Sequence, residues 1–224
     1  DFADNSFKLD VFELVAQRTV AKPGDAGFRV DLATGSSVPR VSSSRGLFRT
    51  DSTTTDIDLQ QAFASVVAPI GSGLRLDLGK FVTPTGYEVI PGYDGWNDNA
   101  TRSILFGFAI PFTHTGVRAT YVFSGHVTGA FLLVNGWDDA EDNNRSKTVG
   151  GQLVLTPATP LTVTLNGLFG PERLNHDSDP RTLLDGSAVW KVNDHVTLGA
   201  SGDWGSERGA VVPGEVARWA GVAG

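Results

Sequence analysis

The sequence contains no cysteine and no methionine among its 224 residues. Without cysteine there is no disulfide framework, no thiolate metal site and no cysteine nucleophile. The longest apolar run, Ile104 to Phe112, is much shorter than the roughly 20 residues that a membrane-spanning helix needs. The net charge of −7 argues against nucleic acid or another polyanion as a partner. Thiol chemistry and helical membrane spans are therefore excluded, and polyanion binding is disfavoured.

Composition favours β structure with many turns, because the chain has 27 glycines and 11 prolines and few helix-forming runs. The mean hydropathy of −0.07 is typical of a soluble protein. Transmembrane β-barrels have similar values, because half of each strand faces a polar lumen. Hydropathy therefore does not separate these two classes.

Apolar and polar side chains alternate over segments of about ten residues, the period of a β-strand. Leu161, Val163 and Leu165, for example, alternate with Thr162 and Thr164. A soluble sandwich would alternate as well, so this pattern alone gives only an all-β class. About eleven strands follow from the pattern, at residues 5–17, 27–35, 56–68, 74–82, 116–123, 127–137, 148–156, 161–169, 181–192, 196–204 and 216–224.

The lengths of the connections alternate between short and long. Short turns are expected at 69–73, 124–126, 157–160 and 193–195, and long polar loops at 36–55, 83–115, 138–147, 170–180 and 205–215. Outer-membrane barrels have short periplasmic turns and longer outer loops, whereas a Greek-key sandwich has no reason to keep this parity. The sequence therefore predicts an all-β fold, an antiparallel up-and-down transmembrane β-barrel that forms a single domain over residues 1–224.

Two segments do not fit simple alternation. Residues 103–112 resemble a strand, but a spanning strand there would place two short connections in succession, so we assign them to a long outer loop at about 83–115. Its apolar side chains would be costly in water and are expected to pack against the barrel wall or in the lumen. An extra strand remains the alternative. Gln61 falls on an otherwise apolar face of the 56–68 segment, and the sequence does not explain it.

Aromatic residues provide a second indication. We take the direction of each strand from the lengths of the connections at its ends. Two groups of aromatic residues then fall at opposite ends of the strands, as expected for girdles at the membrane interfaces. Trp137, Phe169 and Trp204 lie at the outer end, and Tyr121, Phe123 and Trp190 lie at the inner end.

Several strings resemble the putative β-barrel porin-2 family of Gram-negative bacteria. They are Gly-Lys-Phe-Val-Thr-Pro at 79–84, Gly-Tyr-Glu at 86–88, Leu-Phe-Gly-Phe-Ala-Ile-Pro-Phe-Thr-His-Thr-Gly at 105–116 and Val-Asn-Gly-Trp-Asp at 134–138. The resemblance covers most of the chain and implies a porin-type channel in the bacterial outer membrane, with no catalytic residues. Such barrels usually finish on an aromatic residue, whereas this chain ends Val222-Ala223-Gly224. An odd number of strands would also leave an open edge in lipid, so we expect C-terminal strands to be missing.

Inward-facing charges are the candidate functional residues. The alternation along each strand places equal numbers of basic and acidic side chains in the lumen. The wall is therefore expected to carry no net charge. The predicted pore-lining residues are Lys8, Asp10, Arg29, Asp31, Asp58, Arg75, Asp77, Arg118, Asp185, Lys191, Asp203 and Arg218. Cross-strand ion pairs that stiffen a wet interior are the alternative interpretation. In the long loop, Glu88, Asp94 and Asp98 outweigh Arg102, which predicts a mildly acidic constriction.

No metal, cofactor or catalytic site is predicted. The acidic run at 138–142 has the oxygen ligands that Ca²⁺ prefers, but its spacing is not that of an EF-hand, and whether it binds calcium stays open. The four histidines, His114, His126, His176 and His195, fall in expected turns or loops. None has a Ser and an Asp placed to indicate a triad, so the chain is not expected to be an enzyme.

These features favour passive diffusion of small polar solutes or ions through an outer-membrane channel surrounded by lipid. One alternative is a structural platform or sleeve, with a plugged lumen, for a partner in an envelope complex. Another is a soluble secreted β-sandwich that binds carbohydrate through Tyr87, Tyr93 and Trp96. The solute, the total strand number, the oligomeric state and an open or plugged lumen are left undecided.

Overall fold

The computed structural model describes residues 7, 9–36, 38, 56–90, 97 and 102–224. These residues form eleven antiparallel strands in one sheet, in the order β1 to β11, and a short helix α2. The elements are β1 (Phe12–Arg18), β2 (Ala26–Thr34), β3 (Ile57–Ala68), β4 (Leu74–Val82), α2 (Ile104–Phe108), β5 (Thr113–Ser124), β6 (Val127–Val134), β7 (Thr148–Ala158), β8 (Leu161–Gly170), β9 (Arg181–Lys191), β10 (Thr197–Arg208) and β11 (Val216–Ala223). None of the helices in the described part is long and apolar enough to cross a membrane.

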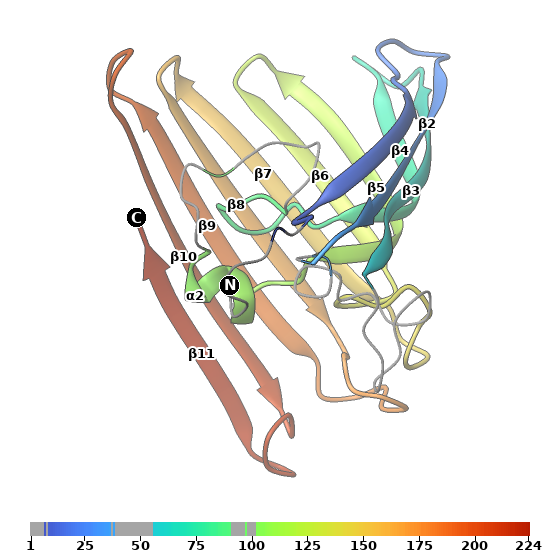
Figure 1. The fold of residues 1–224 in the computed structure, drawn as a ribbon, viewed down its shortest axis with the longest axis vertical. Coiled ribbons are helices and arrows are strands. Elements are labelled where there is room, and N and C mark those ends of the chain that lie inside the picture. Colours follow the sequence, from blue (N-terminus) through green and yellow to red (C-terminus); the bar gives the residue numbers. More distant parts are fainter. Residues whose placement is uncertain (1–6, 8, 37, 39–55, 91–96, 98–101) are drawn as a thin grey trace.

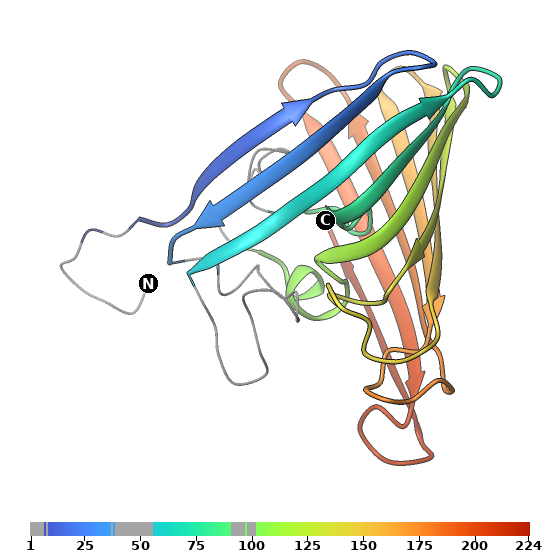
Figure 2. The same ribbon diagram turned by 90° about the vertical axis from the view of Figure 1, so that its right-hand side faces the viewer.

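Every strand pairs with its neighbours in sequence, so the sheet is an up-and-down meander. It curves into a deep arc with a convex and a concave face (Figures 1 and 2). Within the described residues β1 and β11 are the two edges, and the sheet is not closed. The predicted all-β antiparallel class is confirmed. The sandwich alternative is wrong, because the described strands all belong to one sheet.

Short and long connections alternate along the chain, as the sequence predicts. The connections 19–25, 69–73, 125–126, 159–160 and 192–196 lie at one end of the sheet, at the top of Figure 1. The connections 35–56, 83–112, 135–147, 171–180 and 209–215 leave and rejoin the strands at the opposite end. Residues 103–112 contain α2 and no strand, so their assignment to the long loop is confirmed. The Ser103 hydroxyl caps α2 by accepting a hydrogen bond from the Phe106 amide at 3.2 Å.

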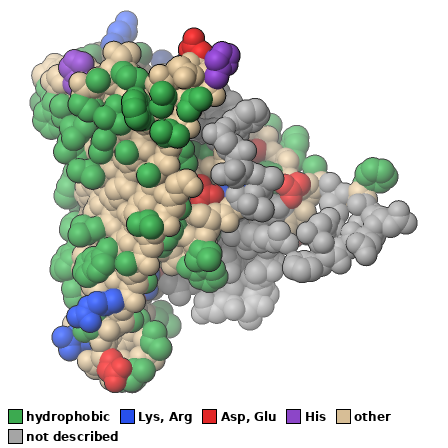
Figure 3. All heavy atoms as spheres, turned by 90° about the vertical axis from the view of Figure 1, so that its left-hand side faces the viewer, with side chains coloured by type: hydrophobic (Ala, Val, Ile, Leu, Met, Phe, Trp, Pro, Cys, Tyr) green, Lys and Arg blue, Asp and Glu red, His purple; other side chains and the backbone are tan. Residues whose placement is uncertain are grey.

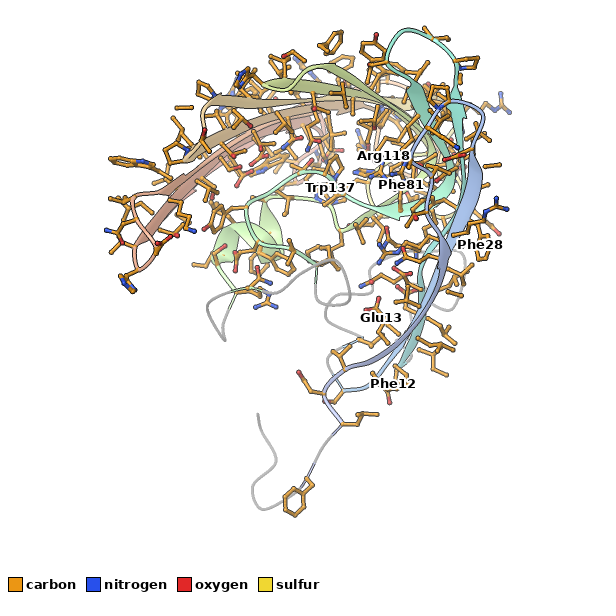
Figure 4. All side chains as sticks on the ribbon, turned by 90° about the horizontal axis from the view of Figure 1, so that it is seen from above. Phe12, Glu13, Phe28, Phe81, Arg118 and Trp137 are labelled. Carbon is orange, nitrogen blue, oxygen red and sulfur yellow. The ribbon has the colours of Figure 1, made fainter. Side chains whose placement is uncertain are left out.

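The convex face is apolar and exposed. Its exposed side chains include Phe28, Val30, Leu32, Val66, Leu78, Phe131, Leu133, Val149, Leu165, Phe169, Leu184 and Trp204. On the sheet in Figure 3, hydrophobic side chains are spread between areas of backbone and other neutral side chains, and many of the charged side chains and histidines lie toward the two ends. In Figure 4, Phe28 points away from the hollow of the arc. So much exposed apolar surface is unfavourable in water and is what a lipid-facing wall requires.

Aromatic residues mark both ends of this face, with one exception. Phe169 and Trp204 are exposed near the loop end, and Phe123 and Trp190 are exposed near the turn end. Trp137 is the exception, because it lies on the concave side and packs edge-on against Trp219, with ring centroids 6.4 Å apart (Figure 4). Its predicted place in the outer girdle is therefore wrong.

A bulge in β3 explains Gln61. Asp31 pairs with Gln61 while the next residue of β2, Leu32, pairs with Leu59, so Gln60 is an extra residue in β3. Because of this extra residue, the side chains on its two sides no longer follow one continuous alternation between the faces of the sheet. The Gln61 side chain therefore points to the concave side. There its amide nitrogen donates to Asp31 at 2.6 Å and its amide oxygen accepts from the Val82 amide at 3.1 Å.

Candidate functional site

The concave face of β2 to β5 carries charges that are paired across strands. Asp77 on β4 is only 1% exposed and accepts hydrogen bonds from Arg75 at 2.8 Å, Arg118 at 2.9 Å and Ser65 at 2.6 Å. The Arg118 guanidinium also lies over the Phe81 ring, 4.6 Å from its centroid (Figure 4). Two arginines thus share one buried carboxylate, which fixes both guanidinium groups on the wall.

Two further ion pairs lie on the same part of the wall. Arg29 and Asp31 are 2.7 Å apart on β2. Lys80 on β4 contacts Asp58 on β3 at 3.2 Å, and both side chains are buried. These pairs fit the interpretation that many of the inward charges stiffen the wall.

The other predicted pore-lining residues have different surroundings. Asp185 on β9 and Asp203 on β10 are buried on the concave side. Lys191 lies at the turn end, exposed, 3.3 Å from Asp194. Asp10 is exposed, and Lys8 lies outside the described residues.

Arg218 was assigned to the wrong face of β11. Its neighbour Trp219 lies against Trp137 and donates to the Ala109 carbonyl, so Trp219 points to the concave side. Because side chains alternate along a strand, Arg218 points to the convex side. There it pairs in register with Ser206 and is exposed.

The described parts of the long loop between β4 and β5, chiefly residues 83–90 and 102–112, lie on the concave side, inside the arc of the sheet (Figure 2). Its first part is held by polar contacts to the middle of two strands. Gln152 on β7 donates to the Pro84 carbonyl at 3.0 Å, and the Gly86 amide donates to Asp185 on β9 at 3.2 Å.

Glycines on the last two strands allow the loop to approach closely. A Cβ atom at Gly199 on β10 would collide with the Tyr87 hydroxyl, and one at Gly221 on β11 would collide with the Leu105 side chain. Tyr87 and Leu105 therefore lie directly on the sheet. This contact places α2 against β11.

An apolar cluster fills the space between the loop and the sheet. It joins Phe106, Ile110 and Phe112 of the loop to Leu168 on β8 and Leu183 on β9. Part of the apolar half of the loop is therefore buried on the inner wall, as expected from its composition, whereas Ile104 and Phe108 of α2 are exposed.

The predicted charges of the loop are only partly described. The Glu88 carboxylate accepts hydrogen bonds from the backbone amide and the hydroxyl of Ser103, so it braces the start of α2. The Arg102 guanidinium lies 5.7 Å from the centroid of the Phe106 ring. Asp94 and Asp98, like the loop aromatics Tyr93 and Trp96, lie outside the described residues.

Three of the four sequence strings that carry the family resemblance, at 79–84, 105–116 and 134–138, meet at His114. His114 is buried in β5, not in a loop as expected, and its ring packs near Phe81 with centroids 6.4 Å apart. Its Nε2 lies 3.1 Å from the Thr83 hydroxyl and its Nδ1 lies 2.9 Å from the Gly136 carbonyl. The ring thus connects the beginning of the inward loop to the next long loop.

The acidic run at 138–142 does not converge on one point. Asp138 accepts hydrogen bonds from the amides of Phe112 and Thr113, at 2.7 and 2.9 Å, and Asp142 pairs with Lys147. In the described part of the chain, no group of three or more His, Cys, Asp or Glu side chains is arranged to hold a metal ion.

A buried carboxyl group, missed from the sequence, joins two of the outer loops. Glu172 accepts hydrogen bonds from the Thr148 hydroxyl at 2.5 Å and the Trp137 amide at 2.7 Å. Burial raises the pKa of the Glu172 carboxyl to about 7, although the two hydrogen bonds and Arg181 lower the pKa and partly oppose this effect. No local sequence pattern distinguishes Glu172 from exposed loop acids such as Glu141.

His176 contacts both Ser178 and Asp179, but in an arrangement unlike a catalytic triad. Both partners lie 3.1 Å from the same ring nitrogen, Nε2. A serine nucleophile needs its base on one nitrogen and the orienting carboxylate on the other. The contacts instead stabilise the loop at 171–180.

A single curved antiparallel sheet with an apolar convex face and a polar concave face is typical of the wall of a porin-like β-barrel. The chain belongs to the family described as Putative beta-barrel porin-2, OmpL-like, whose model matches residues 1–224. Porins of this kind belong to the outer membrane and are generally not enzymes. Searches of the curated proteins and of the solved structures found no match.

Proposed function

We propose that the protein is an outer-membrane channel for the passive diffusion of small polar solutes or ions, with lipid on its convex face. The observation that carries this proposal is the position of the described loop residues 83–90 and 102–112, which contact the concave wall at β7, β9, β10 and β11. A loop fixed in this position narrows the lumen near the middle of the strands. It would then set the size limit of the channel.

The distribution of charge supports a route for charged or polar solutes. Arg29, Arg75 and Arg118 line a cavity of about 330 Å³ beside Gln61 and Phe63 on one side of the arc. Across the arc, the wall beside the loop carries acidic side chains, Asp185 on β9 and Asp203 on β10. The arginines are paired with Asp31 and Asp77, so their part of the wall offers a solute polar groups with little net charge.

Replacing residues 86–109 of the complete protein by a short Gly-Ser linker tests this role. We expect single-channel conductance in a planar bilayer to rise, because the segment that narrows the lumen is removed. A matched variant with residues 210–214 shortened should keep the original conductance, since that loop tip is exposed. Equal conductance in the native protein and in the loop replacement would refute the constriction. Absence of conductance in both would favour the platform alternative.

A further inference from the structure

Arg218 is a charged side chain on the apolar, convex face of the sheet. It is exposed on β11, and among the described residues no acidic side chain forms an ion pair with it. An unpaired arginine is costly near the middle of a bilayer and costs little at its surface, where the guanidinium meets lipid headgroups. We therefore expect Arg218 to lie at the level of the headgroups.

The neighbouring residues place Arg218 at the outer end of the strands. Trp204 on β10 is exposed on the same face and pairs in register with Ala220 on β11. Tryptophan favours the membrane interface, and Arg218 lies two residues from Ala220 toward the long loops, which face outward in outer-membrane barrels. In Figure 3, basic side chains likewise lie near the lower end of the molecule, beside hydrophobic ones. Arg218 thus lies just beyond the aromatic level, toward the outer leaflet.

The row of register partners that contains Arg218 changes from apolar to polar across the sheet. From β7 to β11 it consists of Val149, Phe169, Thr182, Ser206 and Arg218. Because the strands of outer-membrane barrels are tilted, such a row also crosses from the apolar band toward the membrane surface. Two hydroxyls therefore lie in the same row as the arginine at its polar end, and hydroxyl and guanidinium groups both donate to phosphate oxygens.

An apolar groove lies next to this polar end, on the side of the turns. Its volume is about 560 Å³, and its lining includes Gly186 and Gly202, which are register partners. A Cβ atom at either glycine would meet no atom closer than 3.4 Å, so the space beside them is open. Asp185 and Asp203 border the groove as well, but their side chains are buried on the concave side. The apolar lining consists of Leu165, Leu184, Trp204, Ala220 and Val222.

The groove and the arginine are arranged like the two parts of a lipid. Arg218 does not line the groove but lies two residues, about 7 Å, beyond its lining residue Ala220. A phosphate likewise lies beyond the end of the acyl chains in a lipid. A second hollow of the convex face, at Gly151, lacks this arrangement, since the apolar Val149 and Phe169 lie at its loop end.

We propose that β9 to β11 bind a phosphate-bearing lipid of the outer leaflet, the class to which lipid A belongs, with an acyl chain in the groove and a phosphate on Arg218. The planar guanidinium matches the geometry of a phosphate, and the Ser206 and Thr182 hydroxyls add donors in the same row. Arg208, diagonal to Arg218 in the register, adds a second basic group, although it also lies 3.8 Å from Asp179. This inference rests on the lipid contact of the proposed function and not on conduction.

Native mass spectrometry of the complete protein, folded in detergent and titrated with lipid A, tests the site. We expect one molecule of lipid A to bind more tightly than lipid A from which the phosphates have been removed. Arg218→Gln should weaken binding of lipid A about fivefold and leave binding of the dephosphorylated form unchanged, since one basic residue at a charged lipid surface contributes about that factor. Gly202→Leu should weaken binding of both forms, because the leucine side chain fills the groove.

Two control variants match these substitutions. Arg145→Gln removes an exposed charge in another outer loop. Gly151→Leu fills the second hollow, where a Cβ atom would meet no atom closer than 3.7 Å. Both variants should bind lipid A like the native protein.

Three outcomes would overturn the proposal. The first is equal binding of both lipids to the native protein, and the second is a native preference for phosphate in Arg218→Gln. The third is a loss of binding in Gly151→Leu that equals the loss in Gly202→Leu, which would mean that acyl chains cover the face without a defined site. Failure of the channel is a separate result, because absent conductance with an intact phosphate preference would reject conduction and retain the lipid site.

Discussion

The indole nitrogen of Trp219 donates a hydrogen bond to the carbonyl oxygen of Ala109, at 3.4 Å, and this contact joins β11 to the far end of the inward loop. The near end is fixed at Pro84 by Gln152 and at Gly86 by Asp185. The loop is therefore attached at both ends, the near end to β7 and β9 and the far end to β11. A segment attached in this way keeps its position only while both attachments hold.

Gly199→Leu should displace the loop from the sheet. The Tyr87 hydroxyl occupies the space of a Cβ atom at Gly199, so a larger side chain forces Tyr87 away. We expect faster proteolysis of the loop and a changed single-channel conductance. Gly202→Leu is the control, because Gly202 faces the convex side, in a groove lined by Leu184 and Trp204. Equal proteolysis of the two variants would contradict the docking of Tyr87.

Leu165→Arg and Thr164→Arg should differ strongly in stability. Leu165 is exposed on the convex face, whereas its neighbour Thr164 points to the concave side. An arginine on the lipid face near the middle of the bilayer costs about 2–4 kcal/mol, and one in the lumen costs little. Denaturant titration of the protein folded in liposomes measures both values. Equal costs would show that lipid does not cover this part of the convex face.

Stability should fall between about pH 4.5 and pH 7 through Glu172. The folded protein holds the proton of this carboxyl up to a pKa of about 7, whereas the unfolded chain loses it near 4.5. The folded state binds more protons in this window, so its stability is greatest below pH 4.5 and decreases as the pH rises to 7. A shift of this size corresponds to about 3 kcal/mol.

Glu172→Gln isolates that contribution, because glutamine does not titrate. The difference in unfolding free energy between the native protein and Glu172→Gln should change by about 3 kcal/mol from pH 4.5 to pH 7.5. Glu141→Gln, at an exposed loop position, should leave the pH profile unchanged. Parallel profiles for the native protein and Glu172→Gln would mean that Glu172 titrates alike in both states.

The sheet could be predicted from the sequence because lipid and water act on opposite faces of each strand. The second half of β8 illustrates this, since Leu165 and Phe169 are exposed whereas Asn166 and Leu168 are buried. The prediction failed where one extra residue shifts the alternation of inward-facing and outward-facing side chains, as Gln60 does in the β3 bulge. It failed also in β11, where small residues flank Arg218 and Trp219 and either face was compatible with the pattern.

The candidate site was harder to predict, because tryptophan is favoured both at membrane interfaces and in packed cores. Trp137 lies at a strand end, where an interface position was the natural interpretation, yet it packs on Trp219 under the Arg181 guanidinium. The sequence did predict that apolar residues of the segment 103–112 pack beside the wall, which holds for Phe106, Ile110 and Phe112 but not for the exposed Ile104 and Phe108. It gave no sign that the loop crosses to Gly199 and Gly221, since that depends on contacts between segments about a hundred residues apart.

The neighbour-only pairing of the strands has a consequence for how such proteins change in size. Each hairpin contacts only the strands on either side of it, so adding or removing two strands leaves every other pairing intact. Such a change also preserves which side of each strand meets lipid and which end of the sheet carries the long loops. Adding or removing a single strand would reverse both for all strands that follow. The hairpin is therefore the unit by which this architecture can be enlarged or reduced, and relatives should differ by pairs of strands.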